Sequence, residues 1–267
     1  GGVSVRASGA GAEAIMLLAC GHASSVHAKN CFRHHQCPNI QKRYPNIVFS
    51  QFTGAEMMAE KYSLSKDELD RYAYQIHQHA IAATQAGNFT DEIIPLKITR
   101  ADGSTDTHHI DEGIRFDASL EGIRNVKLIA ENGKLTAASA SQICDGASGV
   151  MVVNEKGLKS LGVKPMARIH HMTMMGGDPV IMLEAPLPAT ERALKKAGMS
   201  IDDIDLFEVN EAFASVPTAW LKSTGGDRAK PHVNGGAIAL GHPLGGSDAK
   251  LMTTPVHAMT QPNRDHG

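Results

Sequence analysis

The sequence feature that most constrains the fold is an alternation of apolar runs with a helical pattern in the second half of the chain. Three apolar runs are expected to be strands: 149–154, 167–175 and 204–210. Residues 188–199, between the last two runs, have the spacing of a helix. Strands that alternate with helices are typical of a layered α/β core. Because ligands of such folds bind at the carboxyl ends of strands, Asn210 at the end of the last run is a candidate site residue.

Two further helices are expected in the first half of the chain. Ser65 and Glu68 have the spacing of a capping box, and the helical pattern that follows them continues up to Gly87. Glycine favours the left-handed conformation found just after a helix, so Gly87 is expected to end this one. Residues 7–21 begin with small side chains, continue with an apolar stripe and end at a glycine, which predicts a buried helix.

The remaining first half is mostly polar. Residues 22–46 have no helical or strand period and are expected to form a loop or a small inserted region. Residues 92–100 favour an extended stretch, and residues 102–123 are typical of a polar excursion on the surface.

Composition excludes several classes of protein. A chain of 267 residues with 42% hydrophobic and 20% charged content can bury a sizeable core. Its formal net charge of −2 gives no basic excess for binding nucleic acid. The sequence has no apolar stretch long enough to span a membrane and does not begin with a secretory signal, so we expect a cytoplasmic or organelle-matrix protein. Four irregularly spaced cysteines are expected to be reduced thiols.

The segment 234–246 holds five glycines and places His242 between Gly241 and Pro243. Glycines allow the backbone to approach a ligand closely, and proline fixes the dihedral angle that follows the histidine. A histidine held in this way is a candidate acid or base, because its pKa lies near neutral pH. Taken alone, however, a histidine in a glycine-rich loop is more often a structural residue.

Four segments together resemble the thiolase family, in particular acetyl-CoA acetyltransferases and 3-ketoacyl-CoA thiolases. The segments, in chain order, are LTAASASQICDGASGV (135–150), GGDPVIMLEAPLPAT (176–190), VNEAFAS (209–215) and NGGAIALGHPLGGSDAK (234–250). The likeness extends from about residue 1 to 255, is strong from residue 47 and is poor between residues 19 and 46.

The resemblance implies an α/β fold, a layered α-β-α-β-α core built from two related halves. Residues 1–21 and 131–160 would form the N-terminal half, 22–130 an inserted loop region, and 161–267 the C-terminal half. Family members also have a first βα unit before the segment that starts here and a closing strand with a C-x-G motif after the segment that ends here. We therefore expect the chain to be incomplete at both ends.

The resemblance further implies an acyltransferase that cleaves 3-ketoacyl-CoA with CoA, or condenses two acetyl-CoA molecules. CoA would be a substrate, with no cofactor or metal required, and the family usually forms homodimers or homotetramers. His242 would activate a nucleophilic thiol. Asn210 would hold a water that, with His242, binds the thioester oxygen.

Other positions carried over from the family concern substrate binding and the nucleophile. Phe213 and Met182 would line the acyl pocket, His171 would lie near the path of CoA, and Gly241 would let the backbone approach the thioester. Arg6 stands where the family has its nucleophilic cysteine, and a guanidinium cannot serve as that nucleophile. Three explanations of Arg6 are open: a catalytically inactive relative, a misaligned or incorrect stretch of sequence around position 6, or a residue changed on purpose. A catalytically inactive relative that binds acyl-CoA is the alternative function.

Rival interpretations of single features are less favoured. A ketoacyl synthase shares the fold, but the NEAFA motif at 210–214 is typical of a thiolase. Cys144 is expected to be structural rather than a nucleophile, and Asn210 could instead cap a helix that begins near Glu211. Histidines and cysteines crowd residues 22–37, but their spacing fits no standard zinc site.

Overall fold

The computed structural model describes residues 14–21 and 38–260, with side chains from residue 38 onward. Arg6 and residues 22–37 lie outside the described residues. The helices described are α2 (Pro38–Arg43), α3 (Gln51–Lys61), α4 (Lys66–Ala86), α5 (Leu120–Arg124), α6 (Glu155–Leu161), α7 (Pro186–Ala197), α8 (Ser215–Thr224), α9 (Ala237–Leu240) and α10 (Ser247–Ala258). The strands described are β1 (Ala14–Gly21), β2 (Leu96–Thr99), β3 (Thr105–His108) and β4 (Gly146–Val153).

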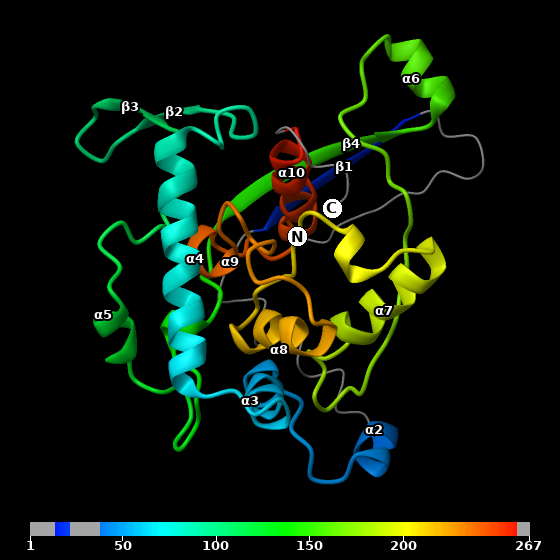
Figure 1. Cartoon of the computed structure of the whole chain (residues 1–267). Coiled ribbons are helices and arrows are strands. Elements are labelled where there is room, and N and C mark those ends of the chain that lie inside the picture. Colours follow the sequence, from blue (N-terminus) through cyan, green and yellow to red (C-terminus); the bar gives the residue numbers. More distant parts are fainter. Residues whose placement is uncertain (1–13, 22–37, 261–267) are drawn as a thin grey trace.

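The long helix α4 begins and ends where the sequence predicts. The Ser65 hydroxyl accepts a hydrogen bond from the backbone N–H of Glu68, and the Glu68 carboxylate accepts one from the backbone N–H of Ser65 at 2.7 Å. Gly87 has the left-handed conformation, with φ of 76°. In Figure 1 α4 runs along one side of the molecule, with α5 beside it and the β2–β3 hairpin at its C-terminal end.

The prediction of a helix over residues 7–21 is wrong for residues 14–21, the part that the structure describes, because they form strand β1. This strand pairs antiparallel with β4, from Ala14 opposite Val153 to Gly21 opposite Gly146. Alanine, leucine and methionine favour helices, but intrinsic propensity is small in energy, and pairing with a neighbouring strand overrides it. Strand β4 confirms the strand predicted near residues 149–154. Helix α10 packs on the β1–β4 pair (Figure 1).

Two other predicted strands are also wrong. Residues 167–175 form neither helix nor strand, and most of their side chains are exposed. Residues 204–210 form only an isolated parallel bridge, between Phe207 and Pro231. Apolar composition predicted both strands, but a strand needs a partner, and the described residues supply none for the first segment and a single bridge for the second. The helix predicted at 188–199 is confirmed as α7.

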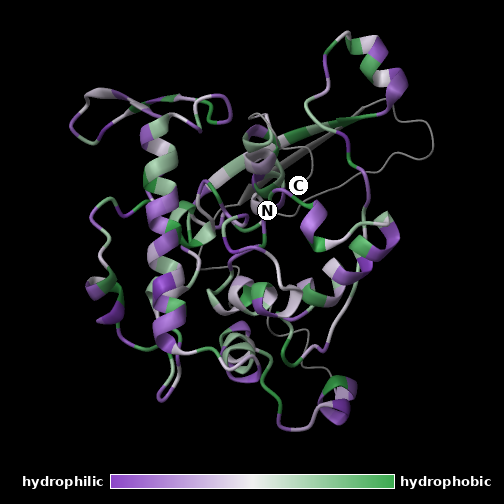
Figure 2. Cartoon of the chain, viewed as in Figure 1, coloured by the Kyte–Doolittle hydropathy of each residue, from purple (hydrophilic) through white to green (hydrophobic). Residues whose placement is uncertain are grey.

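The core lies where α3, α4, α8 and α9 meet. Met58 of α3, Leu69 of α4, Trp220 of α8 and Ile238 of α9 are each at most 2% exposed. Figure 2 shows both hydrophilic and hydrophobic residues along α4. Its buried residues include Leu69, Ala73, Ile76 and Ala80, whose spacing is that of one helix face. Helices α3 and α4 lie within the range 22–130, and the division of the chain at residues 21, 130 and 160 stays a prediction.

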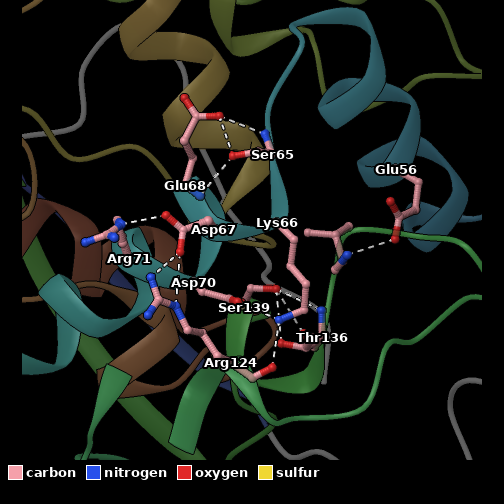
Figure 3. A network of polar contacts seen from close by, with 11 residues as sticks. Glu56, Ser65, Lys66, Asp67, Glu68, Asp70, Arg71, Arg124, Thr136 and Ser139 are labelled. Carbon is pink, nitrogen blue, oxygen red and sulfur yellow. Dashed lines mark hydrogen bonds and ion pairs between the residues drawn. The ribbon is translucent and has the colours of Figure 1, made fainter. Parts of the chain in front are cut away.

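A polar network fixes the N-terminal end of α4 (Figure 3). The Lys66 ammonium contacts the Asp70 carboxylate at 2.5 Å and donates to the backbone carbonyl of Arg124 at 3.0 Å. The Asp67 carboxylate accepts from Arg71 and Arg124. These contacts join α4 to the end of α5 and so keep α4 in place against the site described next.

Candidate active site

His242 lies between α9 and α10 and is held on two sides. Its backbone N–H donates to the carbonyl of Gln142 at 2.9 Å. Its ring Nδ1 lies 2.5 Å from the Ser247 hydroxyl, at the first residue of α10. That hydroxyl is also 3.3 Å from the carbonyl of Pro243. If the hydroxyl donates to this carbonyl, it accepts from Nδ1–H and leaves Nε2 with a free lone pair.

Burial determines the protonation of His242. The ring is half-buried, and burial lowers its pKa. The Asp248 carboxylate opposes this shift, and the Lys250 ammonium adds to it. A lowered pKa keeps the imidazole neutral at neutral pH, so the side chain is able to accept a proton.

Gly241 is required by a close approach of two segments. Its φ is 77° and its ψ is 163°, a conformation that side chains with a Cβ rarely adopt. A Cβ at this position would lie 2.5 Å from the Cys144 sulfur. The packing of Cys144 on Gly241 therefore explains the glycine next to the histidine.

Lys250 supports the same loop and was missed by the sequence analysis. Its ammonium donates to the carbonyls of Leu240 at 2.6 Å and Gly241 at 3.1 Å, and lies 3.8 Å from the Asp111 carboxylate. Burial lowers the pKa of Lys250. The signal for this residue was its place eight residues after the histidine, within the first turn and a half of the following helix.

Asn210 and the histidine loop share one pocket. Asn210, Gly241, Ser247 and Lys250 all line it. The Asn210 side-chain oxygen is buried and has no hydrogen-bond partner in the described part of the chain. A buried polar atom of this kind is expected to bind a ligand or an ordered water. The alternative that Asn210 caps a helix beginning near Glu211 is wrong, because α8 begins at Ser215.

The two predicted acyl-pocket residues, Phe213 and Met182, each lie beside helix α3. Phe213 is 2% exposed, and its ring contacts Phe52 edge-to-face at 5.4 Å between centroids. Met182 has a φ of 41°, a left-handed conformation uncommon for a side chain of its size. A Cβ on Gly54 of α3 would lie 3.3 Å from Met182 Cγ and 2.6 Å from the carbonyl oxygen of Ile181.

Two other residues singled out in the sequence have different positions. His171 is exposed, lies on no strand and does not line the pocket of Asn210. Cys144 is half-buried, and burial raises the pKa of its thiol, which disfavours the reactive thiolate.

Comparisons with known proteins identify the family. Residues 24–156 match the N-terminal domain of thiolases, and residues 163–267 match the C-terminal domain. The chain resembles a solved structure of human mitochondrial 3-ketoacyl-CoA thiolase with a TM-score of 0.82 and 34% identity, covering 94% of this chain and 67% of that one. A structure of the Bacillus anthracis acetyl-CoA acetyltransferase gives a TM-score of 0.75 and 33% identity, covering 81% and 55%. This chain therefore belongs to the thiolase family and has its α/β fold.

Among curated relatives, the steroid 3-ketoacyl-CoA thiolase FadA6 of Mycobacterium tuberculosis is 50% identical over 212 residues. These residues are 79% of this chain and 51% of the relative. The 3-ketoacyl-CoA thiolase of Cronobacter sakazakii is 43% identical over 235 residues, 86% of this chain and 61% of the relative. The chain thus spans roughly half to three fifths of the length of these curated relatives.

The described residues contain neither a membrane-spanning helix nor a metal-binding group. None of the helices in this part of the chain is both long and apolar enough to cross a membrane. Histidine, cysteine and acidic side chains between residues 38 and 260 form no group that would hold a metal ion. The predicted absence of a zinc site at residues 22–37 lies outside the described residues.

Proposed function

We propose that the chain is part of an acyl-CoA C-acyltransferase that cleaves 3-ketoacyl-CoA with CoA and, in reverse, condenses two acetyl-CoA molecules. The observation that supports the proposal is one pocket lined by Asn210, whose amide oxygen is buried and unpartnered, and by Gly241 and Ser247, which hold His242 between them. CoA is the second substrate, and the scheme needs no cofactor. The names of the relatives support the same reaction class.

The chemistry has two steps, and His242 acts as base and acid. The scheme needs the nucleophilic cysteine that thiolases carry at the position of Arg6. Nε2 takes the proton of that thiol, and the thiolate attacks the 3-keto carbonyl. The carbon–carbon bond to C2 then breaks, and its electron pair takes a proton, which releases acetyl-CoA and leaves an acyl thioester on the enzyme. In the second step the thiol of CoA, deprotonated in turn, attacks this thioester. The new acyl-CoA leaves and the enzyme thiol is restored.

Asn210 helps to stabilise the oxyanion that forms in each attack. Its buried amide oxygen accepts from a water, and that water donates to the oxyanion together with the protonated His242. Phe213 and Met182 form the apolar wall for the acyl chain, and α3 supports both through Phe52 and Gly54. His171 and Gly241 are proposed to lie along the bound CoA; Gly241 lines the pocket of Asn210, and His171 does not.

A second candidate function is acyl-CoA binding without turnover, and Arg6 favours it. A guanidinium at the position of the family nucleophile stays protonated at any workable pH and cannot form an acyl thioester. Cys144 does not replace the missing thiol, because burial raises its pKa and it packs on the backbone of Gly241.

Peptide mass spectrometry of the intact protein tests the two functions against each other. The protein is incubated with acetoacetyl-CoA, then alkylated with iodoacetamide and digested. A peptide covering position 6 with the mass of cysteine and an acetyl label supports the acyltransferase. A peptide with the mass of Arg6, and no acyl label on any residue, contradicts turnover and leaves acyl-CoA binding. Assembly into homodimers or homotetramers and a cytoplasmic or organelle-matrix location stay predictions.

A further inference from the structure

Four ionisable side chains that have no role in the proposed reaction form a cluster next to the Asn210 segment. Tyr72 comes from α4, Glu208 and Glu211 flank Asn210 in sequence, and His232 lies in the segment before α9. The side chains of His232 and Glu211 have no exposed surface, and that of Glu208 is 10% exposed. Buried charges cost free energy unless they are paired, so each of these groups is expected to have a partner within the cluster.

The imidazole of His232 bridges the two glutamates. Its Nδ1 lies 2.8 Å from a Glu208 oxygen, and its Nε2 lies 3.7 Å from a Glu211 oxygen. The Tyr72 hydroxyl donates to the same Glu211 oxygen at 2.6 Å. The other Glu211 oxygen accepts from the backbone N–H of Ile238 at 2.9 Å. The cluster therefore joins α4, the segment of Asn210 and the start of α9.

The backbone of His232 is itself constrained. Its φ is 50°, a left-handed conformation that is strained for a side chain with a ring. Its N–H donates to the carbonyl of Phe207 at 3.1 Å, and its own carbonyl accepts from Nδ1 of His79 on α4 at 2.9 Å. Strain of this kind persists only where the surroundings hold the residue on several sides.

The two carboxylates raise the pKa of His232, whereas the hydrogen bond from the backbone N–H of Val209 to Nε2, at 3.4 Å, needs that nitrogen to be unprotonated. Burial alone lowers the pKa of the imidazole, but the Glu211 and Glu208 carboxylates raise it to about 9. Burial raises the pKa of Glu211, and its hydrogen bonds from Tyr72 and Ile238 oppose that shift. Nδ1–H donates to the Glu208 carboxylate in either charge state of the ring, so removal of the ring would leave Glu208 without this donor.

We propose that His232 is a positioning residue that fixes the Asn210 segment against the His242 loop. Glu208, which it holds, lines the same pocket as Asn210. Glu211, which it also faces, holds the second residue of α9, and α9 ends at Leu240, two residues before His242. Loss of the bridge frees both segments at once. This inference rests on the proposed acyl transfer, in which Asn210 and His242 must face the same oxygen.

The test compares His232→Ala, His232→Asn and the matched control His109→Asn in the full-length protein. Asparagine tolerates a left-handed backbone and keeps one donor near the position of Nδ1. His109 is an exposed histidine whose ring contacts only the carbonyl of Thr107 among the hydrogen bonds described. With acetoacetyl-CoA and CoA, we expect His232→Ala to lower kcat on the order of 100-fold, with KM changed by less than about threefold. The kcat of His232→Asn should be about tenfold higher than that of His232→Ala, and the kcat of His109→Asn should match that of the parent protein.

Two results would overturn the role of His232. One is an unchanged kcat in His232→Ala, and the other is a loss of kcat equal to the loss of folded protein measured by circular dichroism. A second readout does not depend on turnover: the Asn210 amide and His242 ring signals in the NMR spectrum should shift in His232→Asn but not in His109→Asn. If the parent protein shows no turnover, the proposed function fails. In that case the NMR comparison still decides whether His232 positions these two residues, since unchanged signals contradict it.

Discussion

Each of the two central polar side chains is positioned by groups outside itself. His242 has its ring fixed by Ser247 and its backbone by Gln142, and burial keeps it neutral. Asn210 has a buried oxygen that no described side chain satisfies. A base with a fixed tautomer and an acceptor kept free for water are the arrangement that oxyanion chemistry needs. Single substitutions around the two residues therefore have separable effects.

Replacing Ser247 with alanine removes the partner of Nδ1 while leaving the imidazole in place. The ring then loses one hydrogen bond, worth about 1 kcal/mol, and its preferred tautomer. We expect kcat for thiolysis to fall about fivefold to tenfold, with the thermal midpoint little changed. Ser247→Thr, which retains the hydroxyl, is the matched control. Equal kcat values for Ser247→Ala and the parent protein would show that this hydrogen bond does not orient the base.

Replacing Gly241 with alanine tests the close packing next to the histidine. The new Cβ would meet the Cys144 sulfur, and the backbone conformation is one that alanine rarely adopts. We expect a loss of about 3 kcal/mol in the free energy of unfolding, measured with urea. Adding Cys144→Ala should restore about 1 kcal/mol, because it removes the steric part and leaves the backbone strain. A Gly241→Ala protein as stable as its parent would contradict the described geometry.

Helix α4 supports the candidate site directly, although it lies more than 100 residues before Asn210 in the sequence. Tyr72 and His79 on this helix contact Glu211 and the backbone of His232, and Ala80 lies under Gly235. The ends of α4 are fixed by the capping box of Ser65 and by Gly87. A change at the end of the helix therefore affects stability first and the site only through the helix as a whole.

Ser65→Ala tests the capping box of α4. It removes the hydroxyl that accepts from the N–H of Glu68, and we expect unfolding to become easier by about 1 kcal/mol. Urea unfolding measures the change. Ser65→Asp keeps an acceptor at the N-cap and should be close to the parent protein. A stability loss in Ser65→Asp as large as in Ser65→Ala would contradict the capping role.

The contacts between elements also predict a pH dependence of stability. The pKa of His232 is about 9 in the folded protein and 6.5 for an unperturbed imidazole. A raised folded pKa gives stability that is fully present below pH 6.5 and is lost as the pH rises through about 9. We expect urea unfolding to show a decline on the order of 3 kcal/mol over this window. In His232→Asn the decline over the same window should be much smaller, and an equal decline would assign it to other groups.

Across the whole molecule, the sequence best predicts those helices and strands whose position is set by residues close together in the chain. The capping box of α4, helix α7 and strand β4 have such signals and are confirmed. The helix expected at residues 7–21 becomes strand β1, because pairing with a strand 125 or more residues further along the chain decides its structure.

The same distinction applies to the site. His242 and Asn210 stand in recognisable motifs, and the structure places Asn210 and the residues flanking His242 around one pocket. His232, Lys250 and Tyr72 were not singled out, because their importance depends on contacts between segments distant in the sequence or across the turn of α10. His171, which the family resemblance places near the path of CoA, is exposed and lies on no strand.

Steady-state thiolysis of acetoacetyl-CoA by the purified protein tests the central claim most directly, measured beside His242→Asn and the exposed control His109→Asn. We expect CoA-dependent turnover by the parent protein and by His109→Asn, and a kcat lower by at least about 100-fold in His242→Asn, with binding of CoA retained. No turnover by the parent protein, or equal turnover by His242→Asn, would contradict acyl transfer at this site.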